Sequence, residues 1–181
     1  MAGADRVDGP IRRIYQGRAV DLDLERVLLP NGDEVELEIV RHPGGAAVVA
    51  VDEQERACLL RQYRHAAGGW LWELPAGKLD GGEPPLQAAR RELAEEAGVS
   101  AGRWTPLGRM VSSPGVFTEV VHLFLAQDLH AVAAAPEHGE CLEVHWVPLG
   151  DALARALTGE LEDAKTVIAL LRAEARVRGR P

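Results

Sequence analysis

The sequence predicts an α/β fold built as a sandwich, and three observations lead to that prediction. Short segments of alternating or continuous apolar residues recur along most of the chain, as expected of strands. A strongly helical segment follows a glycine-rich loop in the middle, and another helical pattern lies near the carboxyl end. With 181 residues, the chain is long enough for one domain with a real core.

The first third of the chain has the pattern of a β-hairpin extension. Its expected strands are residues 11–15, 20–29 and 35–40. Between the last two, Pro30-Asn31-Gly32-Asp33 is a turn signal, because Asn-Gly favours the positive φ angles of a tight hairpin. We therefore expect an N-terminal β extension over residues 1–43 and a main domain over residues 44–181.

At the start of the main domain, Pro43-Gly44-Gly45 interrupts the strand pattern. The expected strands are residues 46–51, 56–63, 71–74, 104–111, 120–126 and 142–148. The central helix should begin near Pro84-Pro85, where first-turn N–H groups lack intrahelical partners, and end at Gly98. Two further helices are expected at residues 151–157 and 163–176.

Composition excludes several classes of protein. A net charge of -8 argues against non-specific nucleic-acid binding, which relies on Lys and Arg. The N-terminus has no apolar segment typical of a signal peptide, and no run approaches the roughly 20 apolar residues that span a bilayer. We expect a cytoplasmic protein without membrane or nucleic-acid partners. Cys58 and Cys141 lie in or beside apolar runs, so both are expected to be buried.

The stretch from Gly77 to Val99 carries the chemistry. On a helix, Glu92, Glu95 and Glu96 would place their carboxylates within about one turn, where like charges repel. Divalent cations such as Mg²⁺ or Mn²⁺ are bound by such oxygens, often together with substrate phosphates. The pattern thus predicts a metal site for phosphate chemistry, although a solvated acidic helix face is the plainer interpretation of Glu95-Glu96 alone.

The whole segment fits the pattern Gly-x5-Glu-x7-Arg-Glu-U-x-Glu-Glu-x-Gly-U, in which U is a bulky apolar residue. The matching residues are Gly77, Glu83, Arg91, Glu92, Leu93, Glu95, Glu96, Gly98 and Val99. This pattern is the Nudix box, and the chain resembles a Nudix hydrolase. The resemblance implies an α/β/α sandwich with a mixed sheet, and a Mg²⁺ or Mn²⁺ cofactor.

The resemblance also implies roles for individual residues. Glu92, Glu95 and Glu96 would bind metal, joined by a backbone carbonyl at Ala76 or Gly77. Glu83 would either approach the metal or hold Arg91 in an ion pair that ties the loop to the helix.

The flanks of the box resemble the ADP-ribose pyrophosphatase branch of the family. Pro114 lies fifteen residues beyond the box, within a Ser-Pro-Gly-x-x-x-Glu arrangement that ends at Glu119. Pro114, Gly115 and Glu119 are therefore expected to bind substrate. Arg64 is the leading cation for a substrate phosphate, since a guanidinium can hold a phosphate bidentately, and a surface ion pair is its alternative.

Besides Glu96, the expected catalytic residues lie in an acidic loop. Relatives often hold a catalytic glutamate here, which makes Glu140 the first candidate for the general base and Glu137 the second. His138 is a third option, since an imidazole with a pKa near 6.5 can accept a proton. The plain alternative for this loop is a solvated acidic turn.

The resemblance implies that the chain hydrolyses the pyrophosphate bond of ADP-ribose, giving AMP and ribose 5-phosphate. GDP-mannose or ADP-glucose is the alternative substrate. A non-catalytic Nudix-fold sensor of ADP-ribose is a further alternative, although such proteins commonly lose box glutamates and this chain keeps all four. Relatives are commonly homodimers whose N-terminal strands help to form the partner's substrate pocket, so we expect a homodimer.

Overall fold

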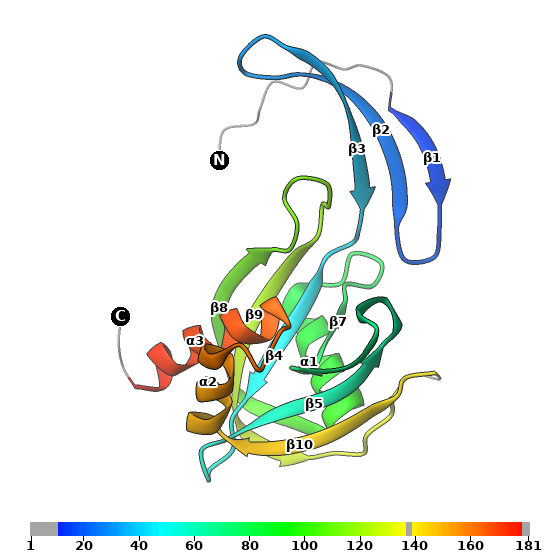
Figure 1. Ribbon diagram of the computed structural model, residues 1–181. Coiled ribbons are helices and arrows are strands. Elements are labelled where there is room, and N and C mark those ends of the chain that lie inside the picture. Colours follow the sequence, from blue (N-terminus) through cyan, green and yellow to red (C-terminus); the bar gives the residue numbers. More distant parts are fainter. Residues whose placement is uncertain (1–10, 137–138, 179–181) are drawn as a thin grey trace. The chain divides into compact units, whose positions relative to one another are not determined.

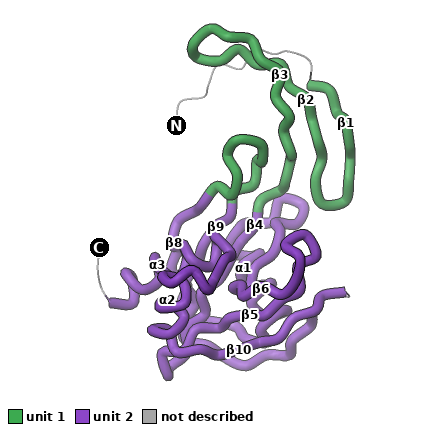
Figure 2. Tube along the Cα trace, in the orientation of Figure 1, with its two compact units in different colours: residues 1–44, 111–120 green, residues 45–110, 121–181 purple. Residues whose placement is uncertain are grey.

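The computed structural model describes residues 11–136 and 139–178 (Figure 1). The chain divides into two compact units (Figure 2). Unit 1 comprises Met1–Gly44 and Val111–Val120, and unit 2 comprises Gly45–Met110 and Val121–Pro181. Residues 111–120, which the sequence placed in the main domain, thus belong to the same unit as the N-terminal strands.

Unit 1 is a three-stranded antiparallel sheet. Its strands are β1 (Arg12–Gln16), β2 (Asp21–Leu28) and β3 (Glu34–Arg41), in the order β1-β2-β3. The predicted hairpin between β2 and β3 is confirmed, with Gly32 at a φ of 90° in its turn. The segment 111–120 attaches to the end of β3, where Val40 donates to the Val116 carbonyl at 2.8 Å and accepts from Thr118 at 3.0 Å.

The buried side chains of unit 1 are acidic. Asp23 is 2% exposed and Glu25 is 8% exposed, and both pair with Arg41, while Arg13 also contacts Asp23. Among the described residues 11–44 and 111–120, no hydrophobic side chain is buried. Large apolar side chains of this unit instead face solvent, including Ile14, Tyr15 and Leu37.

Unit 2 contains two sheets. Its strands are β4 (Gly45–Ala50), β5 (Arg56–Arg64), β6 (Gly69–Glu73), β7 (Ala76–Lys78), β8 (Val99–Val111), β9 (Val120–Ala131) and β10 (Leu142–Pro148). One sheet has the order β10-β5-β6 and the other β7-β4-β9-β8. Since β4 pairs parallel with β9 and antiparallel with β7, the second sheet is mixed, as predicted.

Three α-helices cover these sheets: α1 (Pro85–Ala97), α2 (Leu149–Thr158) and α3 (Ala164–Val177) (Figure 1). The fully buried strand β4 alternates between two cores. Val48 belongs to the core that includes Leu93 of α1, whereas the next residue, Val49, belongs to the core that includes Leu170 of α3. Strands therefore lie between α1 on one side and α2 with α3 on the other, which confirms the predicted α/β/α sandwich.

Several element boundaries differ from the prediction. The strand expected at 104–111 begins at Val99, directly after Gly98 ends α1 with a φ of 65°. The strand expected at 120–126 continues to Ala131. A Cβ at Gly102 would overlap the carboxylate of Asp128, so a side-chain pattern could not reveal this close approach. The short strand β7 in the opening of the box was not predicted, and α2 begins two residues early.

The prediction of two buried cysteines is right for Cys58 and wrong for Cys141, which is exposed. Cys141 directly precedes β10, a strand in which no side chain is fully buried. In the part of the chain that the structure describes, no helix has the length and apolar character needed to cross a membrane.

Candidate active site

Helix α1 presents the box carboxylates. Proline stands in its first turn, and Gly98 in the left-handed conformation ends it, so the helix has the predicted extent. Glu92 and Glu96, one turn apart, share the face that carries the buried residues Ala89 and Leu93. They are only 8% and 3% exposed, whereas Glu95 is half-buried.

The opening of the box packs closely on this face. The backbone N–H of Ala76 donates to Oε2 of Glu96 at 2.8 Å, which fixes one carboxylate. A Cβ on Gly77 would overlap the carboxylate of Glu92. Gly77 is therefore required here for close approach of the backbone to a side chain.

Burial disfavours the charged form of both glutamates. Burial raises the pKa of Glu96 to about 8; the N–H of Ala76 opposes this, and the charges of Glu92 and Glu140 add to it. The pKa of Glu92 is also raised, first by burial, against the lowering effect of Arg91. Since the charge of Glu140 acts on both carboxylates, the first candidate base lies close to the box glutamates.

Arg91 forms ion pairs with three acidic residues of the box. Its guanidinium contacts Glu92 at 2.7 Å, Glu95 at 3.1 Å and Glu83 at 3.1 Å. It also donates to the carbonyl of Lys78 at 3.1 Å, so it links the loop to the helix. The hydrogen bond to Glu83 is the largest cause of its raised pKa. Glu83 thus makes the contact that its scaffold role predicts.

Arg64 lies at the end of β5 beside this group. Its positive charge lowers the pKa of Glu96, against the larger effect of burial. Its Nε and Nη2 donate to the two oxygens of Glu73 at 2.8 and 2.9 Å. The predicted phosphate-binding arginine is therefore also one half of a bidentate ion pair.

Three predicted substrate residues, Pro114, Gly115 and Glu119, belong to unit 1. Glu119 lies 3.4 Å from Nδ1 of His42, an ion pair when the imidazole is protonated. The backbone N–H of His42 also donates to Oγ1 of Thr118 at 3.0 Å. In the acidic loop Glu140 is half-buried, whereas Glu137 and His138 lie outside the described residues.

Residues 41–171 match the NUDIX domain family, which covers well over half of the chain. The chain belongs to the Nudix family. Similar proteins include an ADP-ribose pyrophosphatase of Bacillus subtilis, 41% identical over 160 residues, or 87% of this chain and 86% of that protein. An ADP-ribose pyrophosphatase of Mycobacterium tuberculosis is 37% identical over 169 residues, or 92% and 82%.

A solved structure titled "Crystal structure of ADP compounds hydrolase" shares the architecture. The TM-score is 0.80, and the match covers 94% of this chain and 92% of that one. At 24% sequence identity this likeness shows the fold alone. It agrees with the Nudix-type sandwich described above.

The donor chemistry of the Nudix box fits a hard divalent cation. Glu92, Glu95 and Glu96 offer only oxygen ligands, which are the ligands that such a cation prefers. Over residues 11–136 and 139–178, however, no three Asp, Glu, His or Cys side chains are arranged as a ready metal cluster. Two of the three carboxylates contact Arg91 instead, and Glu96 faces Ala76.

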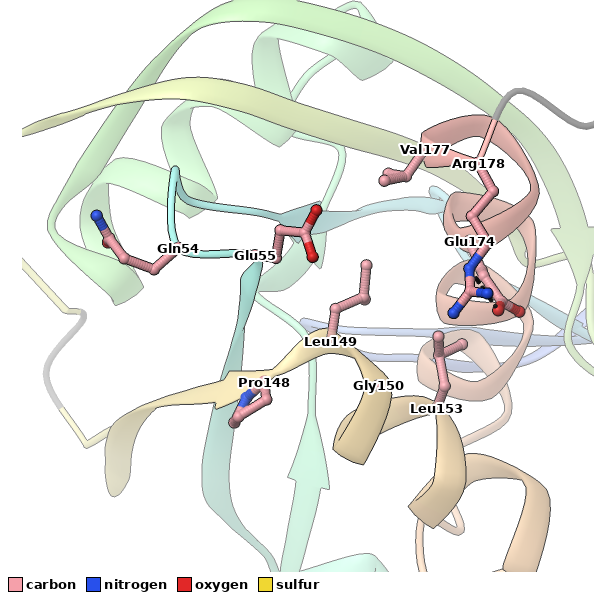
Figure 3. Close-up of a pocket in the computed structure, with 9 residues that line it drawn as sticks. All are labelled: Gln54, Glu55, Pro148, Leu149, Gly150, Leu153, Glu174, Val177 and Arg178. Carbon is pink, nitrogen blue, oxygen red and sulfur yellow. Dashed lines mark ion pairs between the residues drawn. The ribbon is translucent and has the colours of Figure 1, made fainter.

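A hollow of about 440 Å³ in unit 2 lies beside α2 and the end of α3 (Figure 3). Leu149 and Leu153 of α2 line it together with Glu174 and Arg178, which form an ion pair of 3.1 Å. None of the predicted site residues lines this hollow.

Sequence reasoning missed Glu73 and its second partner, Lys165, whose Nζ lies 2.7 Å from Oε2 of Glu73. A signal was present, because Glu73 interrupts the apolar run Trp70 to Leu74 and is 2% exposed. A carboxylate in such a position must find cations. One of these cations, Lys165, lies on α3, more than ninety residues away along the chain, and no local pattern predicts its contact with Glu73.

Proposed function

We propose that this Nudix protein hydrolyses the pyrophosphate bond of ADP-ribose to AMP and ribose 5-phosphate, with Mg²⁺ or Mn²⁺ as cofactor. The observation that carries the proposal is the buried pair Glu92 and Glu96, packed against Gly77 and within reach of the charge of Glu140. The similarity to two ADP-ribose pyrophosphatases over most of the chain supports the choice of substrate.

Glu92, Glu95 and Glu96, with the carbonyl of Ala76, would hold the cation. When bound, the cation neutralises charge on the phosphate oxygens and lowers the pKa of water. Glu96 is oriented for this role by the N–H of Ala76. Arg91 holds the carboxylates in place beside one another and is itself tied to the loop through Glu83 and Lys78.

Glu140 is the first candidate for the general base, with its carboxylate accepting the proton of the attacking water. Its effect on the pKa values of Glu92 and Glu96 supports this choice. Glu137 remains the second candidate and His138 the third, both on the sequence pattern alone.

Arg64 would bind a substrate phosphate. A guanidinium has five N–H donors, and Glu73 engages Nε and Nη2, so the two donors on Nη1 suit an anion. The sequence pattern alone supports substrate binding by Pro114, Gly115 and Glu119.

We also infer a homodimer formed with the N-terminal strands of residues 1–43, which would contribute to the partner's substrate pocket. The sheet of unit 1 buries no hydrophobic side chain among its described residues and exposes Ile14 and Tyr15. A small sheet needs an apolar face covered for stability, and a second copy of the chain could supply that cover.

The proposal is tested with purified protein, Mg²⁺ and a panel of ADP-ribose, ADP-glucose and GDP-mannose. The expected result is the highest kcat/KM for ADP-ribose, with AMP and ribose 5-phosphate as products. A higher kcat/KM for another compound would support the alternative substrate. Tight binding of ADP-ribose without product over hours would support the sensor.

A further inference from the structure

A cluster of charged side chains around the buried Glu73 joins the first turn of α3 to the end of β6. We call Arg64, Glu73, Asp163 and Lys165 the Glu73 cluster. Glu73 accepts hydrogen bonds from Nε and Nη2 of Arg64, and from Nζ of Lys165 at 2.7 Å. Lys165 also lies 3.0 Å from Asp163. Two cations and two anions thus balance around a carboxylate that is 2% exposed.

The position of Lys165 is unusual for a helix. The first turn of a helix carries partial positive charge, which disfavours a cation there. Asp163, the N-cap, and Glu73 together offset that effect. The placement of Lys165 is thus explained by what it contacts outside the helix.

Thr166, the residue after Lys165, connects the first turn of α3 to the backbone that leads into the box. Its hydroxyl is fully buried, donates to Asp163 at 2.5 Å and accepts from the N–H of Leu74 at 2.9 Å. The carbonyl of the next residue, Pro75, accepts a hydrogen bond from the N–H of Val48 at 2.9 Å. The N–H of Ala76, the residue after Pro75, donates to the carboxylate of Glu96. Three successive residues entering the box are therefore fixed by hydrogen bonds.

The first turn of α3 reaches the candidate site by two routes. One route runs from Lys165 through Glu73 to the guanidinium of Arg64. The other runs from Thr166 through the backbone of residues 74–76 to Glu96. Neither Lys165 nor Thr166 is a box residue, so each would act on the site only through the residues that it contacts.

We propose that Lys165 and Thr166 are positioning residues of the hydrolytic site. Lys165 orients Arg64 for the substrate phosphate through Glu73, and Thr166 orients Ala76 and Glu96 for the cation through Leu74. The inference rests on the proposed hydrolysis of ADP-ribose.

The route through Arg64 is tested by a double-mutant cycle with K165M and R64K. In the wild-type background, K165M should lower kcat/KM for ADP-ribose by about 10- to 100-fold, mainly through KM. In the R64K background, where the bidentate pair is already lost, K165M should have little further effect. R176M removes a charge from an exposed position of the same helix and should leave both parameters unchanged. Equal losses from K165M in both backgrounds would overturn this route.

The route through Thr166 is tested by Mn²⁺ binding, measured by electron paramagnetic resonance without substrate. T166V removes the acceptor for Leu74 and should weaken Mn²⁺ binding by about tenfold or more, whereas T166S keeps the hydroxyl and should restore it. Thermal unfolding establishes that each variant is folded. If T166V does not fold, the T166A variant replaces it in the same comparison. Unchanged Mn²⁺ affinity in the folded variant without the hydroxyl would overturn this route.

The two readouts separate failure of this inference from failure of the proposed function. Wild-type protein that binds Mn²⁺ but leaves ADP-ribose intact would contradict the proposed function, and the Mn²⁺ titrations would still decide the role of Thr166. Wild-type protein that cleaves ADP-ribose while K165M and T166V behave like wild type would contradict this inference alone.

Discussion

Gly77 and Glu92 lie so close together that any side chain at residue 77 would overlap the carboxylate. The contact joins the first glycine of the Nudix box to its central glutamate across the β7–α1 connection. The backbone of the box opening therefore lies directly against the carboxylate of Glu92, one of the residues proposed to hold the cation.

Replacing Gly77 by alanine should displace Glu92. We expect kcat/KM for ADP-ribose to fall roughly 100-fold, since small misplacements at a site have effects of that size. Steady-state kinetics and thermal unfolding of G77A provide the measurement. G150A is the matched control, because nothing lies within 4 Å of a Cβ at that position. Equal kinetics for G77A and wild type would show that the close approach is not needed.

Replacing Glu140 by glutamine should remove the general base. The expected loss is about 10²- to 10⁴-fold in kcat, with little change in KM. E143Q changes an exposed glutamate only three residues later and should behave like wild type. If E140Q keeps the kcat of wild type, the base lies elsewhere, with Glu137 and His138 as the next candidates.

Glu73 should make the protein sensitive to acid. Burial would raise the pKa of Glu73, but hydrogen bonds and charges from Arg64 and Lys165 outweigh burial and lower it. A lowered folded pKa stabilises the fold fully above the unfolded value of about 4.3, and this contribution is lost as pH falls through the folded value. Urea unfolding should therefore give a smaller difference between wild type and E73Q at pH 3 than at pH 7.

At pH 7, E73Q leaves Arg64 and Lys165 without their shared anion. Because Arg64 is partly exposed, we expect a loss of about 1–3 kcal/mol in the free energy of unfolding. A constant difference between wild type and E73Q from pH 7 to pH 3 would contradict the lowered pKa.

Sedimentation velocity at micromolar concentration should give the mass of two copies of the 19.5 kDa chain. The reason is the sheet of unit 1, whose exposed Ile14 and Tyr15 find no cover among the side chains of that unit. Replacing Ile14 by serine should weaken the dimer, whereas R26S at an exposed position should not. A monomer at all concentrations would contradict the inferred dimer.

The sequence predicted the sandwich and the helix of the box because those features depend on local rules. Proline in the first turn, Gly98 at the end and the spacing of Glu92 to Glu96 are all visible in one segment. Strand β7 and the early start of β8 could not be predicted in this way, since β7 pairs with β4 and β8 with β9, which are distant along the chain.

The candidate site was predicted where one segment supplies it and missed where distant segments meet. The box glutamates and the ion pair of Glu83 with Arg91 follow from spacing along a loop and a helix. Arg64 was identified as a cation, but its bidentate partner Glu73 on strand β6 was not, and neither was the contact of Glu73 with Lys165 of α3. Tertiary packing decides such contacts.

The central claim is that the buried glutamates of α1 support metal-dependent cleavage of ADP-ribose. The most direct measurement is the Mg²⁺-dependent formation of AMP and ribose 5-phosphate by wild type and by E96Q, with folding of both verified. We expect cleavage by wild type, no cleavage without the cation, and turnover lower by about 10³-fold or more in E96Q. Wild-type rates in E96Q, or no cleavage by the wild-type protein with Mg²⁺ or Mn²⁺, would contradict it.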